Sequence, residues 1–174
     1  SFTKRLKQRA DISHVTVSGA VPGVEVANYF TNRPYGSDPS QVKLIQMFAV
    51  DYDYLALYSP EMLCGRGFSE AYGNERNKVV LNEEAVRLLG YPSPEEALGK
   101  QLEMEVLEDP LEVVGVVKNY HQQSLAEPYK PILFFLKERV PFIATPYISV
   151  KMDGPVNSDR LAEVEQMYRT YFPS

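Results

Sequence analysis

The stretch KVVLNEEAVRLLG occupies residues 78–90 and changes from strand to helix periodicity within a few residues. Its first part, Lys78–Leu81, is apolar and rich in valine, which is typical of a short strand. Asn82 is a preferred helix N-cap, and the two glutamates after it place carboxylates in the first turn, where the helix dipole favours them. Gly90 fits a left-handed C-cap. The stretch therefore predicts a strand followed directly by a short capped helix.

Another short helix is predicted immediately downstream. Ser93-Pro94-Glu95-Glu96 forms a capping box with proline at the first helical position, and Gly99 ends the helix. Gln101–Leu107 and Leu111–Val117 then have strand character on either side of Glu108-Asp109-Pro110. This pattern predicts a β-hairpin.

The flanking segments supply further strands and helices. Strands are predicted at His14–Ala20, Val24–Phe30, Val42–Val50, Pro131–Leu136 and Tyr147–Met152. Loops are predicted at Asn32–Ser40 and at Gly65–Asn77, the second of them exposed to solvent. Helices are predicted over residues 1–10, over Asp51–Tyr58 with Asp51 as N-cap, and from Ser158 onward with a buried stripe of Leu161, Val164, Met167, Tyr168 and Tyr171. Irregular alternation of strands and short helices favours an α+β fold with mixed sheets over repeated βαβ units.

Composition places the chain among ordinary globular proteins. It has 174 residues, 44% hydrophobic and 24% charged, which suffices for a core in one domain or two small lobes. A net charge of −5 and a pI near 5.1, without a basic stripe, argue against a nucleic-acid surface. No apolar run approaches the ~20 residues of a membrane-spanning helix. The chain starts in helical pattern at Ser1, and we expect both ends to have been cut from a longer protein.

Motifs that carry catalysis or nucleotide binding are missing from the sequence. Residues 65–70, GRGFSE, begin like a dinucleotide fingerprint but lack its third glycine and precede a predicted loop. There is no Walker A loop, serine-nucleophile elbow or zinc-protease motif. The single cysteine, Cys64, is interpreted as a small apolar packing residue. We therefore expect no catalytic residue, no metal site and no bound cofactor.

Three features allow two interpretations each. The cations Lys4, Arg5, Lys7 and Arg9 form either a solvated helix face or a segment near anionic lipid headgroups. His121 is either a turn residue bonded to the backbone or a general base. Six tyrosines either pack at the edge of the core or line a groove for an apolar ligand: Tyr29, Tyr52, Tyr54, Tyr58, Tyr120 and Tyr129.

Three segments occur in the order and spacing of one known family. MLCGRGFS at residues 62–69 is similar to its "aGRxFs" segment, and residues 79–100 resemble its "vvlNEaavrxlGxxxpeeaiGk" core. VVGVVKNYHQQSL at residues 113–125 resembles "VvGVvkDfHxxSL", and Pro131 matches the proline that follows. Asn119 stands where aspartate is usual, and the next residue is tyrosine where phenylalanine is usual. Together the segments resemble the MacB-like periplasmic core domain of FtsX/MacB-type ABC transporter permeases, particularly the Bacteroidetes-type members.

This resemblance implies a domain carried between transmembrane helices on the periplasmic face of the inner membrane. Residues 1–58 and 132–174 are expected to form a porter-like lobe, and residues 59–131 a smaller inserted α/β lobe. A separate cytoplasmic ATPase uses ATP, and the domain passes the resulting motion to a substrate or an envelope partner protein, a mechanism called mechanotransmission. Structural or partner-contact roles are expected at the signature positions Gly65, Arg66, Asn82, Glu83, Gly90, Gly99, Lys100, Gly115 and His121.

Two other functions are open at this point. A soluble sensor domain would use the tyrosine-rich region as a small-molecule pocket. A hydrolase would bring His121, Ser124 and Glu127 together in space, and it predicts that His121 lies buried in a cleft. Neither is supported by a motif in the sequence.

Overall fold

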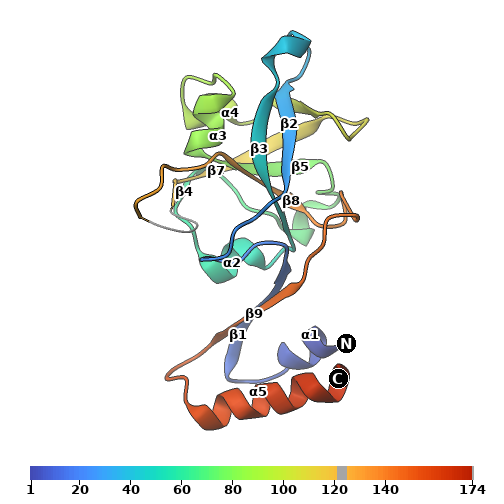
Figure 1. Cartoon of the computed structure of the whole chain (residues 1–174), viewed down its shortest axis with the longest axis vertical. Coiled ribbons are helices and arrows are strands. Elements are labelled where there is room, and N and C mark those ends of the chain that lie inside the picture. The colour runs from blue at the N-terminus through green and yellow to red at the C-terminus, as the bar shows by residue number, and fades with distance from the viewer. Residues whose placement is uncertain (121–124, 174) are drawn as a thin grey trace.

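The first feature of the structure is a closed ring of strands. The computed structural model describes residues 1–120 and 125–173 (Figure 1). Its strands are β1 (Ile12–Ser18), β2 (Tyr29–Pro34), β3 (Lys43–Val50), β4 (Met62–Gly65), β5 (Lys78–Asn82), β6 (Gln101–Met104), β7 (Leu111–Val117), β8 (Ile132–Leu136) and β9 (Tyr147–Met152). They pair in the order β2-β6-β7-β5-β8-β3, and β2 also pairs with β3, so these six strands close on themselves as in a small barrel.

Short helices decorate this ring. They are α1 (Phe2–Leu6), α2 (Tyr54–Tyr58), α3 (Glu83–Leu88), α4 (Pro94–Ala97) and α5 (Ser158–Tyr171), with 3₁₀ turns η1 (Pro39–Gln41) and η2 (Glu70–Tyr72). The architecture is therefore α+β with mixed pairing: β3 and β8 run parallel, as do β5 and β7, whereas the other pairs are antiparallel.

Alternation along the strands divides the core in two. On β3, Met47 and Ala49 belong to the larger apolar cluster together with Leu133 of β8, whereas the intervening Phe48 belongs to a second cluster with Phe134. Successive side chains of a strand point to opposite faces, so the first cluster fills the ring and the second covers its outer face beneath α2. Phe48 and Phe134 meet edge to face, with ring centroids 5.4 Å apart.

Both chain ends meet in a separate small unit at the bottom of Figure 1, which we call the terminal unit: α1, β1, β9 and α5. Strands β1 and β9 pair antiparallel from Ser18 opposite Tyr147 to Ile12 opposite Met152. Its core is small and combines Phe2, Leu6, Ile12 and Val15 with Ile148, Val150, Met152, Val164 and Met167. Only one register pair, Ser18 with Val50, joins β1 to the ring strand β3.

Four local predictions are wrong in their details. The second strand lies at Tyr29–Pro34 instead of Val24–Phe30, because pairing with β3 and β6 overrides the turn composition of residues 32–34. Helix α2 has Asp53 as its N-cap residue, and the Asp51 carboxylate accepts both from Val17 N–H of β1 and from Asp53 N–H, the latter at 3.1 Å. In the predicted exposed loop Gly65–Asn77, Phe68 and Glu75 are buried.

The fourth concerns α5, whose N-cap is Asn157 and not Ser158. None of its residues is buried, although a buried stripe was predicted: Leu161 is 54% exposed and Tyr168 47%. The reason is the small partner of this helix. Val164 and Met167 pack on the two-stranded ribbon, which is too narrow to cover the rest of the apolar face.

The division into lobes of residues 1–58 with 132–174 and of residues 59–131 stays a prediction. Strands of both sets share the ring, since β3 and β8 pair with each other and β8 also pairs with β5.

Candidate functional site

Two signature glycines lie where β4 crosses closest to β7. Gly65 pairs with Gly115, and a Cβ at Gly65 would lie 2.2 Å from the Val114 carbonyl oxygen. A Cβ at Gly115 would lie 2.2 Å from the carbonyl oxygen of Arg66. No side chain fits at such distances, so both glycines are required by the close approach of the two backbones.

Arg66 forms an ion pair, which we call the latch, with the buried Glu75, a residue that sequence patterns did not single out. Its guanidinium donates to both Glu75 carboxylate oxygens, at 2.9 and 2.7 Å, and the Ser69 N–H donates to the same carboxylate at 3.0 Å. The Tyr72 ring stacks on the guanidinium at 3.8 Å. Burial alone would raise the pKa of Glu75, but the hydrogen bonds from Arg66 and Ser69 outweigh it and hold the pKa below its ordinary value.

The lowered pKa of Glu75 predicts acid sensitivity. The latch contributes its full stability above the ordinary glutamate value of 4.5, and that contribution is lost as the pH falls through the lowered folded-state pKa. Glu75→Gln should cost about 2 kcal/mol of unfolding free energy at pH 7 and remove this part of the acid dependence. Urea unfolding between pH 3 and 7 measures both. Glu70→Gln, at an exposed site in η2, is the control and should change stability by less than about 0.5 kcal/mol; equal effects of the two variants would contradict the prediction.

Asn82 joins three segments of backbone. Its side-chain oxygen accepts from Ala85 N–H at 2.9 Å, which caps α3 as predicted, and from Ile132 N–H at 2.9 Å. Its amide nitrogen donates to the Lys130 carbonyl at 2.8 Å. Because Asn82 is fully buried, its role is to hold the start of β8 against α3.

A reciprocal pair of bonds fixes the chain after β7 to the same helix. The Asn119 N–H donates to the Glu83 carboxylate at 2.8 Å, and the Asn119 side-chain oxygen accepts from Glu84 N–H at 2.9 Å. An aspartate at 119 would supply the same acceptor, so the departure from the family pattern keeps the contact.

The other signature positions are at turns. Gly90 has φ +85° after α3, as predicted, and Gly99 has φ +75° after α4. The Lys100 backbone bonds Val113 and Ala97, and its side chain is exposed. His121 lies outside the described residues, as does Ser124. The described signature residues therefore use their polar groups mainly within the chain, around the β4–β7 crossing and the N-terminus of α3.

The tyrosines mostly pack within the molecule. Tyr54 is buried on the second core cluster, and Tyr58 and Tyr120 pack against it. Burial raises the pKa of Tyr54 and Tyr120 well above the usual range. Burial also raises the pKa of the Cys64 thiol, which keeps it protonated, and this residue packs on the larger cluster. Among residues 1–120 and 125–173, no group of three or more potential metal ligands lies together.

The junction between the ring and the terminal unit depends on Asp51 and its neighbours. The Asp51 carboxylate accepts from the Thr16 hydroxyl and from Val17 N–H, the latter at 2.7 Å. Tyr58 of α2 and Ser149 of β9 share a hydrogen bond of 2.7 Å. These contacts attach α2 and the residue Asp51 before it to both strands of the terminal unit, β1 and β9.

Part of the basic cluster is paired with carboxylates, by Arg9 inside the terminal unit and by Lys7 across its junction with α2. Lys7 pairs with Asp53, and Arg9 pairs with both Asp11 and Glu163. Hydrogen bonds from Arg9 hold the pKa of Asp11 at about 2. The cluster is thus not simply a solvated helix face, since two of its four cations bind carboxylates.

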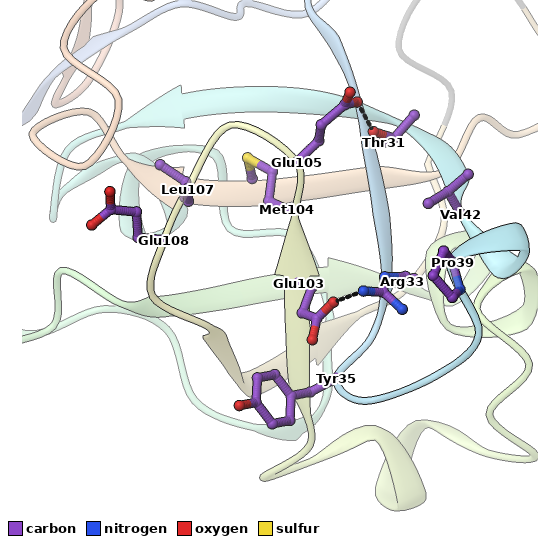
Figure 2. Close-up of a pocket in the computed structure, with 10 residues that line it drawn as sticks. All are labelled: Thr31, Arg33, Tyr35, Pro39, Val42, Glu103, Met104, Glu105, Leu107 and Glu108. Carbon is purple, nitrogen blue, oxygen red and sulfur yellow. Dashed lines mark hydrogen bonds and ion pairs between the residues drawn. The ribbon is translucent and has the colours of Figure 1, made fainter.

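A groove of about 590 Å³ lies on the outer side of the ring, between the β2–β3 hairpin and the chain that leaves β6 (Figure 2). We call it the hairpin groove, and Thr31, Arg33, Tyr35, Pro39, Val42, Glu103, Met104, Glu105, Leu107 and Glu108 line it. Arg33 is ion-paired with Glu103, and Thr31 donates to Glu105. The tip of this hairpin lies at the opposite end of the molecule from the two termini (Figure 1).

The hairpin groove was not predicted from the sequence. Most of its residues come from the predicted loop Asn32–Ser40 and from the predicted hairpin of residues 101–117, and Val42 comes from the predicted strand Val42–Val50. The sequence could indicate which side chains of β2 and β6 share a face, because side chains alternate along a strand. It could not indicate that the two strands are neighbours.

Comparison with known proteins gives consistent results. A family model described as the MacB-like periplasmic core domain matches residues 3–165. The ABC transporter permease YvrN of Bacillus subtilis is 33% identical over 122 residues, which is 66% of this chain and 29% of that protein. The chain therefore spans less than a third of the length of this relative. No helix of the described residues has the length and apolarity needed to cross a membrane.

Several solved structures have a similar fold. The extracellular domain of the ABC-type transporter YknZ from Gram-positive bacteria aligns with a TM-score of 0.64 at 15% identity, covering 98% of this chain and 82% of that chain. The periplasmic region of MacB from Actinobacillus actinomycetemcomitans aligns at 0.66 and 18%, covering 98% and 72%. A permease domain from Porphyromonas gingivalis aligns at 0.64 and 12%, covering 97% and 75%.

Proposed function

The chain belongs to the family of MacB-like periplasmic core domains of ABC transporter permeases, and from that premise we propose that it relays ATP-driven conformational change to a substrate or partner protein. In this proposal a separate cytoplasmic ATPase uses ATP, and the transmembrane helices of the inner-membrane permease move the terminal unit. The domain itself acts without catalysis and without a cofactor.

The junction at Asp51 is the observation that carries the proposal. Both chain ends lie in the terminal unit, so a displacement applied there reaches the ring through β1 and β9. Bonds from Asp51 to Thr16 and Val17 resist independent movement of the two parts. A relay requires such a connection between its input and a rigid body that moves as a unit.

Three signature side chains, those of Arg66, Asn82 and Glu83, are used in internal bonds, which supports a role without catalysis. The Arg66 and Glu75 charges neutralise each other, and Asn82 and Glu83 bind backbone groups. Catalytic groups need free lone pairs or protons directed at a substrate. These four side chains instead make the ring rigid, which is the property that a relay needs.

The relay predicts that Asp51→Ala uncouples the ring from the terminal unit. In the full-length permease with its ATPase in nanodiscs, spin labels at Ser40→Cys and Ala162→Cys, with Cys64→Ser, report the distance across the junction. Without the Asp51 substitution this distance should change by less than about 2 Å on ATP binding. Fluorescence energy transfer from a dye attached at Ser40→Cys to a headgroup-labelled lipid should also change on ATP binding.

Asp51→Ala should broaden the distance distribution between these labels and reduce the nucleotide-dependent change in energy transfer. Asp109→Ala is the matched control, because Asp109 is 70% exposed, lies 3.8 Å from Arg139, and belongs to the connection between β6 and β7, which contains neither a label nor a junction contact. It should leave both measurements unaltered. Energy transfer that does not respond to ATP in the unsubstituted permease would contradict the relay.

A further inference from the structure

The hairpin groove carries an excess of negative charge. Three carboxylates line it, from Glu103, Glu105 and Glu108, against a single guanidinium, from Arg33. The Arg33 guanidinium is already bound within the chain, since it pairs with Glu103 and donates to the Ser37 carbonyl. Glu105 accepts from the neutral Thr31 hydroxyl. Within the described residues 1–120 and 125–173, neither Glu105 nor Glu108 is ion-paired, so the groove holds two carboxylates without a neutralising cation.

Apolar side chains accompany these carboxylates. Tyr35 is 58% exposed and Val42 is 43% exposed, and both belong to the hairpin that forms one wall. Leu44 of β3, which lies opposite Thr31, is also 57% exposed. Three large exposed apolar residues on one hairpin are typical of a surface that another molecule covers.

Size and charge together specify the occupant. A volume of about 590 Å³ accommodates a few side chains of an extended segment. Complementarity requires a cation opposite Glu105 and Glu108, and an apolar group opposite Tyr35 and Val42.

From this geometry we propose that the hairpin groove binds a partner segment in which lysine or arginine alternates with apolar residues. The inference rests on the proposed function, because it assigns the surface through which the relayed motion leaves the domain. The groove lies toward the end opposite the termini, where a partner has access while the terminal unit is held by the rest of the permease (Figure 1).

Nuclear magnetic resonance titration of the ¹⁵N-labelled chain tests the proposal. The probe is an acetylated and amidated nonapeptide of alternating lysine and leucine. Two matched peptides replace lysine by glutamate or leucine by serine. The lysine–leucine peptide should shift resonances of Thr31–Val42 and Glu103–Glu108, and each matched peptide should bind about tenfold or more weakly.

Charge-matched variants locate the site. The double substitution Glu105→Gln and Glu108→Gln should weaken binding about fivefold. Glu95→Gln with Glu96→Gln removes the same charge from exposed positions of α4 and should change affinity by less than about twofold. Circular dichroism and urea unfolding confirm that each variant is folded.

Shifts spread over the whole surface, equal binding of the glutamate peptide, or equal weakening by the α4 pair would each overturn the proposal. The titration uses no nucleotide and no ATPase. A failure here leaves the movement measured across the Asp51 junction unaffected, and a failure of that movement leaves this binding unaffected.

Discussion

Gly65→Ala should destabilise the domain by about 2–5 kcal/mol. The new methyl group would lie 2.2 Å from the Val114 carbonyl oxygen and 2.8 Å from the Gly115 Cα, and backbone atoms cannot move aside as a side chain does. Strand β4 must therefore separate from β7, which adds about 1–3 kcal/mol to the ~1–2 kcal/mol that an L-residue costs at φ +70°. Urea unfolding followed by circular dichroism measures the loss.

Gly99→Ala separates these two contributions. Gly99 has almost the same backbone angle, φ +75°, but nothing lies within 4 Å of a Cβ added there. Its substitution should cost only about 1–2 kcal/mol, from the left-handed conformation alone. If Gly65→Ala and Gly99→Ala cost the same, the close contact at the β4–β7 crossing has no energetic importance and its interpretation is wrong.

Local signals explain what could be predicted. The caps at Asn82 and Ser93 were predicted because an N-cap is decided by a side chain and a backbone N–H two or three residues away. Gly90 was predicted from another local rule, the preference for glycine at the left-handed position that follows a helix. Each of these features needs no information about the rest of the fold.

Contacts between distant segments explain what could not be predicted. Asp51 has the composition of an N-cap, but its carboxylate bonds to residues 34 and 35 positions earlier in the chain. Glu75 appeared as one charge in a polar loop, and only the fold brings it under Arg66. The sequence pattern also cannot show that β2 closes the ring onto β6, which creates the hairpin groove.

The family motifs identified residues with partners inside the domain but not the exposed residues of the hairpin groove. They marked Arg66 and Asn82, whose partners are inside the domain, and so they pointed to the rigid body of the proposed relay. They did not mark Tyr35 or Val42, which are exposed. This difference is physically reasonable, because a shared fold constrains buried contacts, whereas a surface that contacts a partner changes with the partner.

The other large effect is expected at Asn82. Asn82→Ala removes three hydrogen bonds at once: the cap on Ala85 N–H, the bond from Ile132 N–H and the bond to the Lys130 carbonyl. A lost cap costs about 1 kcal/mol, and a buried group left without a partner costs about 1–3 kcal/mol. We expect a loss of about 3–5 kcal/mol in unfolding free energy, measured by urea unfolding.

Asn157→Ala is the matched control, since Asn157 also caps a helix but makes a single bond, to Arg160 N–H at 3.0 Å, at an exposed site. It should cost about 1 kcal/mol or less. The difference between the two variants measures the attachment of β8 to α3, because the capping contribution is common to both. Amide exchange at Ile132 should accelerate in Asn82→Ala well beyond the change in global stability, since this N–H loses its acceptor directly. Equal losses in the two variants would mean that Asn82 acts as a helix cap alone and that β8 is held by its strand partners.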